Sequence, residues 1–185
     1  MQTLDAAEGP VRSRRRVTLG HLVFWIAAAS VVAIDQATKA IVRGTMNVGD
    51  AWPEDWPVNI RYVTNTGAAF GSLQNATTFL IAMSLIGLAA IYLYYRNPPF
   101  QHWLASVGIG MMLGGAVGNL IDRVRLGRVT DFIHFPHWPN FNVADSSIFV
   151  GVAIILAGYL LFGETKPASS PAMPAEPHED APSDG

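Results

Sequence analysis

The chain has 185 residues, of which 50% are hydrophobic and only 14% are charged, a composition typical of a small protein with several membrane spans. A formal net charge of -2 without a polybasic face argues against a nucleic-acid partner. The absence of cysteine excludes disulfides, thiolate catalysis and thiolate metal sites, so any nucleophile is a hydroxyl, a carboxylate or an activated water.

The two ends of the chain differ from its apolar centre. Residues 1–19 are polar and include an arginine cluster at residues 12–16, and residues 165–185 are rich in proline, alanine, serine and acids. Such compositions do not form packed cores. We therefore expect disordered tails at 1–19 and 165–185 and a membrane domain at 20–164.

Four apolar runs lie between the tails, at His21–Val42, Thr77–Tyr95, Trp103–Ile121 and Ser147–Phe162. Each is close to the roughly 20 residues that a spanning helix needs, although the last is somewhat short. We expect the first run to be an uncleaved span, because its apolar stretch is followed by Asp35, Gln36 and Lys39 where small residues would mark a cleavage site. The fold class expected is an all-α membrane protein with four transmembrane helices and a small extracytoplasmic β element.

The positive charges predict an orientation. The arginine cluster before the first span should hold the amino terminus in the cytoplasm, and an even number of spans returns the carboxyl terminus to the same side. Arg96 marks the short loop between the second and third spans as cytoplasmic. The remaining loops then face outward.

The outer loop from Gly44 to Ala76 is too long for a simple connector. An alternating stretch at residues 58–63, followed by a turn containing Gly67 and Gly71, predicts a short strand and turn. One interpretation is a tight turn on the membrane surface. The other is a platform that pairs with an extended peptide through main-chain hydrogen bonds.

Three aspartates near the outer ends of the last two spans demand an explanation, because ionisable groups at membrane depth are costly. Asp122 is followed by Arg123 and sits three residues after Asn119, which favours a structural ion pair or hydrogen-bond network. Asp131 has apolar neighbours that favour a neutral carboxyl. Asp145 precedes the fourth run, where a helix cap is the ordinary explanation.

Asp131 and Asp145 also form a candidate catalytic pair. The segment from Ile133 to Ala144 contains prolines and can fold back, which would bring the two carboxyls together. Two close carboxyls share a proton, so that one can activate water while the other protonates the carbonyl or the leaving group.

The sequence also offers two alternative kinds of catalytic site and one ion pair that could support the site. His134 and His137 suggest a metal site with Asp131 or Asp145, but the helical spacing of zinc peptidases is absent. Ser146 and Ser147 lack the surroundings of a serine nucleophile. On the first span, Asp35 and Lys39 have the i, i+4 spacing of an ion pair that could also line the site.

The chain resembles the lipoprotein signal peptidases, or signal peptidase II, a family of bacterial membrane aspartyl proteases. The resemblance runs from the first span to the fourth, although the segment between the two acids looks short for the family and the tails are not part of its pattern. It rests on Asp35-Gln-Ala-Thr-Lys39, Asn65-Thr-Gly-Ala-Ala-Phe-Gly71, Gly114-Gly-Ala-Val-Gly-Asn-Leu-Ile-Asp-Arg123, Val129-Thr-Asp-Phe132 and Phe141-Asn-Val-Ala-Asp145.

The resemblance implies that Asp131 and Asp145 are the catalytic dyad of an aspartic endopeptidase. It implies diacylglyceryl-modified prolipoproteins as substrates, cut before the lipidated cysteine. No metal or organic cofactor is required. The residues matching family positions around the dyad are Asp35, Lys39, Asn65, Gly67, Asn119, Asp122, Arg123 and Asn142.

The expected location is the bacterial inner membrane, with several spans, both termini in the cytoplasm and the active site near the outer surface. We expect contact with membrane lipid and a monomer. Two other function classes remain open: a small proton-coupled transporter, disfavoured because the acids cluster at the outer boundary without an internal repeat, and a non-catalytic lipid-binding protein.

Overall fold

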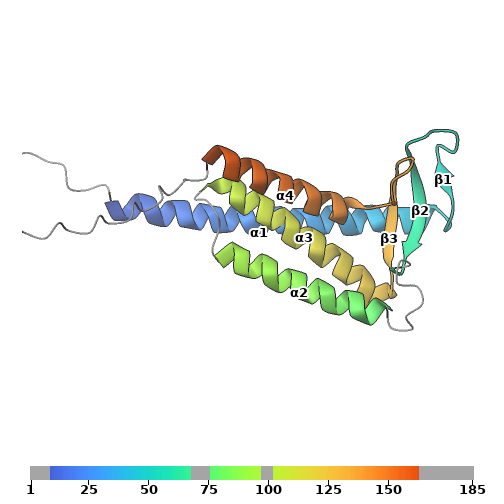
Figure 1. Cartoon of the computed structure of the whole chain (residues 1–185), viewed down its shortest axis with the longest axis horizontal. Helices are drawn as coiled ribbons and strands as arrows, with labels where there is room; N and C mark the ends of the chain where they lie inside the picture. The colour runs from blue at the N-terminus through green and yellow to red at the C-terminus, as the bar shows by residue number, and fades with distance from the viewer. Residues whose placement is uncertain (1–8, 68–75, 97–101, 163–185) are drawn as a thin grey trace, which may run out of the picture.

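The computed structural model describes residues 9–67, 76–96 and 102–162. The four helices form an elongated bundle, and three short strands form a sheet across one end of it (Figure 1). In chain order the elements are α1 (Gly9–Thr45), β1 (Ala51–Trp52), β2 (Asn59–Asn65), α2 (Ala76–Arg96), α3 (Trp103–Leu126), β3 (Val129–His134) and α4 (Val143–Phe162).

All four helices are long and apolar enough to cross a membrane, at Leu19–Thr45, Thr77–Arg96, Trp103–Leu126 and Val143–Phe162. The predicted four-span architecture is confirmed. The protein is therefore a multi-pass membrane protein whose sheet lies at one end of its spans.

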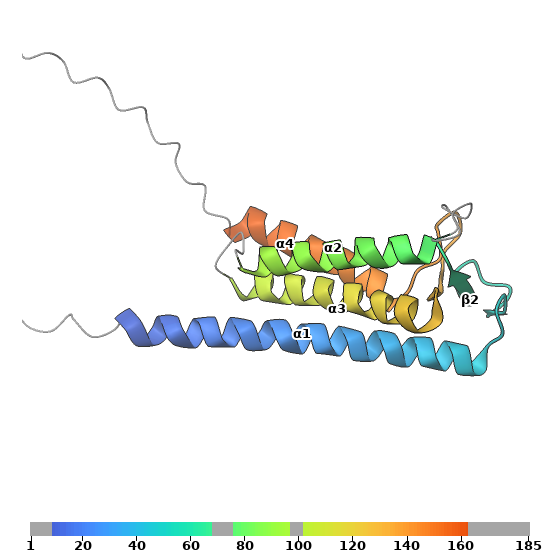
Figure 2. The ribbon, with the colours of Figure 1, turned by 90° about the horizontal axis from the view of Figure 1, so that it is seen from below.

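α1 begins earlier than the sequence predicts and protrudes beyond the other helices at the end away from the sheet (Figure 2). The helix thus extends from Gly9 into the stretch 1–19 for which a disordered tail is expected, and the domain boundaries stay a prediction. Pro10 is compatible with this start, because the first turn of a helix needs no partner for its N–H groups and proline has none to offer. Residues 1–8 and the expected tail at 165–185 lie outside the described residues.

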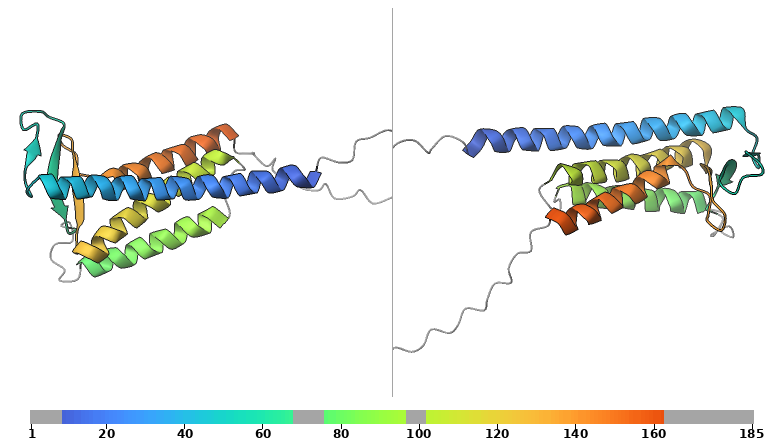
Figure 3. Two further views of the ribbon diagram at one scale, coloured as in Figure 1. Left: turned by 180° about the vertical axis from the view of Figure 1, so that it is seen from behind. Right: turned by 90° about the horizontal axis from the view of Figure 1, so that it is seen from above.

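α3 is the central helix of the bundle and packs against α1, α2 and α4 (Figure 3). Its glycines allow the close approach. A Cβ at Gly115 would collide with the backbone oxygen of Ala144 on α4, and one at Gly118 would lie 2.5 Å from Asp35 Oδ2 on α1. The start of α4 and the carboxylate of α1 are thereby brought against the same turn of α3.

The sheet is antiparallel, with strand order β1-β2-β3. Val63 pairs with Asp131 and Thr64 with Thr130, and a register shift lies between Ile60 and Val63. The predicted strand near residues 58–63 is confirmed as β2. β3 escapes prediction because its first four residues are all buried, so its sequence shows no alternation of apolar and polar residues.

A small apolar cluster joins the sheet to the end of α1. Val42 packs with Tyr62 of β2 and Phe132 of β3, each less than a tenth exposed. Since Phe132 follows Asp131 directly, this packing helps fix the strand that carries the acid.

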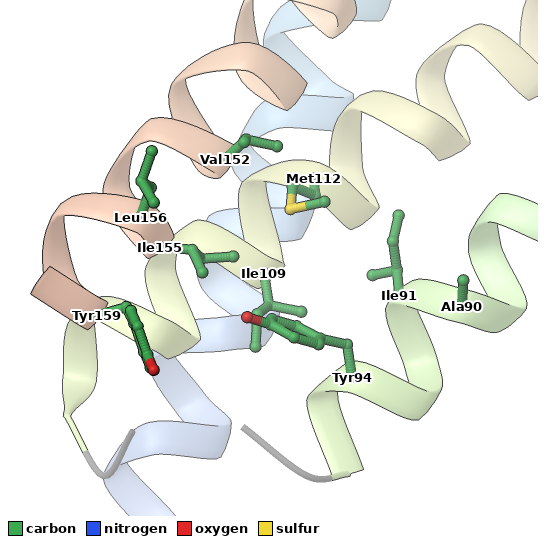
Figure 4. A pocket seen from close by; sticks show the side chains of 9 residues that line it. All are labelled: Ala90, Ile91, Tyr94, Ile109, Met112, Val152, Ile155, Leu156 and Tyr159. Atoms are coloured by element: carbon green, nitrogen blue, oxygen red, sulfur yellow. The ribbon is translucent and has the colours of Figure 1, made fainter. Parts of the chain in front are cut away.

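An apolar cavity of about 600 Å³ lies between α2, α3 and α4 (Figure 4). Tyr94, Ile109 and Tyr159 are among its lining residues, and none of the lining residues is charged. The cavity therefore lacks carboxylates and cations, which are gathered at the sheet end.

Candidate active site

The predicted site residues converge where the sheet meets the bundle. Most are buried, with no more than 6% exposure for Asp35, Lys39, Asn119, Asp122, Asp131 and Asn142. Buried charges on this scale need mutual pairing or hydrogen bonds to be tolerated.

The start of α4 is organised by Asn142. Its Oδ1 accepts a hydrogen bond from the Asp145 backbone nitrogen at 3.0 Å, and its own backbone nitrogen donates to Asp145 Oδ2 at 3.3 Å. This reciprocal pattern is a capping box. The interpretation of Asp145 as the cap is therefore wrong: Asn142 is the cap, α4 starts four residues before the predicted Ser147, and Asp145 lies in its first turn.

The side-chain amide of Asn142 also reaches the other acid. Asn142 Nδ2 donates to Asp131 Oδ1 at 2.7 Å, with Asn119 Oδ1 and the Thr130 carbonyl at 3.1 and 3.3 Å. One residue thus contacts both Asp131 and Asp145. The structure brings the two predicted acids to a common residue.

The segment between the acids folds back as predicted. The backbone nitrogens of Phe132 and Ile133 both donate to the Phe141 carbonyl, at 3.0 and 2.8 Å, and the Phe141 nitrogen donates to the Ile133 carbonyl at 3.1 Å. These bonds close the loop at residues 134–140. They place the start of α4 beside β3.

Asp131 is 2% exposed and is held from both sides. Asn65 Nδ2 on β2 donates to Asp131 Oδ2 at 3.0 Å, opposite the bond from Asn142. Burial raises the pKa of Asp131 to about 6; the hydrogen bond from Asn65 opposes this rise, and nearby Asp145 adds to it. A carboxyl in this setting can carry a proton near neutral pH.

Asp145 is linked to a buried cation through one asparagine. Asn119 Nδ2 donates to Asp145 Oδ1 at 2.8 Å, while Asn119 Oδ1 accepts from Lys39 Nζ, also at 2.8 Å. The positive charge of Lys39 therefore fixes the orientation of the amide that faces Asp145. The orientation of Asp145 is therefore tied through Asn119 to the position of Lys39 on α1.

Lys39 lies at the centre of a buried ion cluster. Its Nζ is 2.9 Å from Asp35 Oδ2 and 3.5 Å from Asp122 Oδ2, which confirms the predicted pair on α1. Asp35 Oδ1 accepts from the Ala144 backbone nitrogen at 3.0 Å, so it also holds the first turn of α4. Among the described contacts, Asp35 and Lys39 reach Asp131 and Asp145 only through intervening residues.

Asp122 makes the predicted structural network, but not with Arg123. Its carboxylate lies 3.6 Å from Arg43 Nη1 and accepts from the Thr130 backbone nitrogen at 3.0 Å. Among the described contacts none is a hydrogen bond or ion pair between Asp122 and Arg123, since consecutive residues on a helix point about 100° apart. Arg123 Nη1 instead donates to Ser84 Oγ at 3.3 Å on α2.

Gly67 ends the described part of the turn after β2. Its φ of 78° lies in the left-handed region, its nitrogen donates to Asn65 Oδ1 at 2.8 Å, and a Cβ here would collide with Leu80. The turn thereby orients the amide of Asn65 towards Asp131. Gly71 lies outside the described residues.

The two alternative chemistries lack the required geometry. His134 Nδ1 contacts Asn140 Oδ1 at 2.7 Å, and within residues 9–67, 76–96 and 102–162 no three histidines or acids gather as metal ligands would. The hydroxyls of Ser146 and Ser147 donate to the carbonyls of Asn142 and Val143 in their own helix, at 2.9 and 2.8 Å. Neither hydroxyl is arranged as an activated nucleophile.

Sequence reasoning missed three residues of this network. Gln36 Nε2 donates to Asp35, to the Gly118 carbonyl and to Asp122, at 3.1, 3.1 and 3.3 Å, and Arg43 donates to the hydroxyl of Thr130. A polar side chain inside a predicted span is the signal that marks Gln36. Nothing in the sequence marks Thr130 beyond its position next to Asp131.

Comparison with known proteins shows consistent similarities. The family model described as signal peptidase (SPase) II matches residues 27–161. The chain is 41% identical over 143 residues to a lipoprotein signal peptidase of Symbiobacterium thermophilum, covering 74% of this chain and 93% of that protein. It is 44% identical over 143 residues to that of Geobacter metallireducens, covering 73% and 88% respectively.

Solved structures agree with this similarity. One bacterial membrane enzyme superposes with a TM-score of 0.67 at 38% identity, covering 73% of this chain and 90% of the other. A second superposes with a TM-score of 0.66 at 36% identity, covering 78% and 92%. The whole length of each relative is nearly spanned.

Proposed function

The chain belongs to the signal peptidase II family and is a membrane peptidase that removes signal peptides from prolipoproteins, and we propose that Asp131 and Asp145 perform the cleavage. The observation that carries this proposal is the contact of Asn142 with both carboxyls. The raised pKa of Asp131, to about 6, supports a pair that holds one proton between two carboxyls.

The mechanism follows from a singly protonated pair. The ionised carboxylate takes a proton from water, whose oxygen attacks the scissile carbonyl carbon, while the neutral carboxyl donates its proton to the carbonyl oxygen. The tetrahedral intermediate then collapses: a proton passes from the first carboxyl to the departing amide nitrogen as the C–N bond breaks, and the second carboxyl recovers its proton. The products are a new carboxyl end and a new amino end.

The surrounding residues divide into two groups. Lys39, Asn119 and Asn142 orient the two carboxyls, and Asp35 and Asp122 anchor α4 and β3 around them. The second group, formed by Arg123, Asn65 and Gly67, can contact the substrate.

Arg123 is the main member of that second group. Its Nε is buried without a hydrogen-bond partner among the described residues, and its guanidinium lies within electrostatic range of Asp145 and Asp131. A buried, unpaired donor beside a reacting pair is suited to a peptide carbonyl. Asn65 and Gly67 border the same site from β2 and its turn.

We propose that the bond cut is the one before a diacylglyceryl-modified cysteine. The dyad lies at the ends of apolar helices, where a substrate anchored by acyl chains would be held. Purified protein in detergent should cleave a lipidated precursor at the modified cysteine, as identified by mass spectrometry. The matched precursor with an unmodified cysteine should react at least about a hundredfold more slowly, because lipid binding contributes to transition-state affinity. Equal rates for the two precursors would mean that the lipid is not recognised. If neither precursor were cleaved, a transporter or a lipid-binding protein would be favoured.

We further propose that both termini face the cytoplasm of a bacterial inner membrane and that the sheet faces outward. The arginine cluster before α1 and the even number of spans support this orientation. Since the chain has no cysteine, the single variants Asp55→Cys, at an exposed position, and Ser170→Cys can be labelled without background. In intact spheroplasts an impermeant maleimide should label only the cysteine at 55, and the opposite pattern would reverse the topology.

The proposed unit is a monomer. Every side chain of the described network comes from one chain, contributed by α1, α3, α4, β2 and β3. The two acids and the asparagines that bond them belong to the same chain, so the proposed reaction requires no residue of a second copy.

A further inference from the structure

Thr130, the residue before Asp131 on β3, is held at three of its polar atoms by three different elements. Its backbone nitrogen donates to Asp122 Oδ2 on α3 at 3.0 Å, and its carbonyl accepts from Asn142 Nδ2 at the start of α4 at 3.3 Å. Its hydroxyl accepts from Arg43 Nη1 on α1 at 3.0 Å. With 1% exposure, the hydroxyl has no access to water as a substitute partner.

Arg43 closes this arrangement from the last turn of α1. The Nη1 that bonds the Thr130 hydroxyl lies 3.6 Å from Asp122 Oδ1, and the side chain is 25% exposed. Asp122 itself contacts the Thr130 backbone, so Arg43, Asp122 and Thr130 form a closed three-residue network. The rigid planar guanidinium suits such a link better than a flexible ammonium would.

The position of Thr130 bears directly on the dyad. Adjacent Cα atoms are about 3.8 Å apart across a fixed peptide plane, so a displacement of Thr130 moves Asp131 as well. Catalytic groups must be held to within about 0.5 Å of their productive geometry.

We propose that Arg43 is a positioning residue, which acts through the Thr130 hydroxyl to set Asp131 relative to Asp145. The inference rests on the proposed role of the dyad. The hydrogen bond and the ion pair of Arg43 go to Thr130 and Asp122, so its effect on the dyad passes through the strand. Its loss therefore affects the geometry of the reacting groups and leaves substrate binding intact.

The chemistry of the network predicts a specific pattern among variants. Arg43→Leu leaves the Thr130 hydroxyl buried without its hydrogen-bond donor. Either β3 shifts so that the hydroxyl finds another partner, or the folded protein is destabilised by the unsatisfied hydroxyl. Thr130→Val preserves the side-chain shape and removes the hydroxyl, while the freed guanidinium is exposed enough to bond water. The double variant Arg43→Leu/Thr130→Val removes both ends of the hydrogen bond, and Asp122, which also loses Arg43, keeps Lys39, Gln36 and the Thr130 backbone nitrogen as partners.

The test is steady-state cleavage of the lipidated precursor by purified variants, with melting temperature measured for each. Arg43→Leu should lower kcat about tenfold with KM unchanged, because the proposed role of Arg43 concerns the geometry of the reacting carboxyls and not contact with the substrate. Thr130→Val cuts the same link at its other end and should lower kcat by a similar factor, and the double variant should be no more impaired than either single variant, because both changes remove one interaction. The conservative Thr130→Ser retains the acceptor and should exceed Thr130→Val in kcat. Thr45→Val, which removes an exposed hydroxyl whose described bond is to the Ile41 carbonyl in α1 at 2.8 Å, serves as the control.

An unchanged kcat in Arg43→Leu would overturn the proposal. So would a wild-type kcat in Thr130→Val, a double variant whose loss is the product of the two single losses, or a loss confined to KM or melting temperature. If Arg43→Leu accumulates poorly, Arg43→Lys keeps the charge beside Asp122 without the planar fork and should show a smaller loss in kcat alone. The wild-type chain and Asp131→Asn are assayed alongside: an inactive wild type or an active Asp131→Asn would contradict the proposed function, and neither result depends on Arg43.

Discussion

Asp131→Asn and Asp145→Asn should each reduce kcat for a lipidated precursor by at least about a thousandfold, because an amide cannot exchange the proton that the mechanism requires. In the wild type, both oxygens of Asp131 accept from amide groups, at 3.0 Å from Asn65 and at 2.7 Å from Asn142. The NH₂ group that Asp131→Asn introduces would therefore face another donor.

The double variant should be hardly worse than either single variant, since residues that act as one unit are not additive. Asp122→Asn is the matched control: it removes a buried carboxyl that contacts Thr130, Lys39 and Arg43, so it should lower folded yield more than it lowers the turnover of the folded fraction. If folded Asp131→Asn protein cut the precursor at nearly the wild-type rate, Asp122 would become the leading partner of Asp145.

Asp131 also gives a pH signature independent of activity. Its pKa is raised from 3.8 to about 6 in the folded protein, chiefly by burial. Stability from this group is therefore fully present below pH 3.8 and is lost as the pH rises through about 6, a change of up to roughly 3 kcal/mol. The melting temperature in detergent should fall more between about pH 4 and pH 8 for the wild type than for Asp131→Asn. Asp55→Asn, at an exposed acid, should retain the wild-type slope.

Lys39→Met should destabilise the protein by about 3–5 kcal/mol, the cost of breaking a buried pair from one side. The change leaves Asp35 and Asp122, at 0% and 1% exposure, without the ammonium that lies 2.9 and 3.5 Å from them. It also removes the donor at 2.8 Å from Asn119, so the amide facing Asp145 loses its fixed orientation. Folded yield, melting temperature and kcat should all fall.

The variant Lys39→Met/Asp35→Asn provides the internal check, because it removes one negative charge together with the positive one and should regain part of the lost stability. Arg96→Met is the matched surface control, at an exposed cation whose described contact is the Tyr92 hydroxyl at 3.2 Å. A Lys39→Met protein as stable as Arg96→Met would mean that the cluster carries no net charge on its acids.

The helices were predictable because their apolar runs are long and their ends are polar. The ion pair of Asp35 and Lys39 was equally predictable, since i, i+4 spacing within one helix needs no knowledge of the fold. The meeting of Asp131 and Asp145 required only a short segment that turns back. Each of these expectations depends on residues close in sequence.

The rest depends on contacts between distant residues. Asn142 caps α4 and bonds Asp131 at once, and nothing in the local sequence distinguishes it from Asp145 as the cap. β3 is buried along its first four residues because it lies between β2 and the helices, which removes the alternation that reveals a strand. The partners of Asp122 lie on α1 and β3, far away in the sequence. Helical geometry predicts only that the neighbouring Arg123 points in another direction, not which residues Asp122 contacts.

The pairing of Asp35 with Lys39 inside a single helix has a consequence for biogenesis. α1 is made first, and Asn119, which also bonds Lys39, follows 80 residues later. At the usual pace of synthesis that interval is roughly 4 to 16 s. During it, α1 must enter the bilayer without α3, and a lone charge there would oppose insertion. Because Asp35 lies one helical turn from Lys39 on the same segment, α1 enters the membrane with its charges already paired. The contacts of Lys39 with Asn119 and Asp122 form only when α3 arrives.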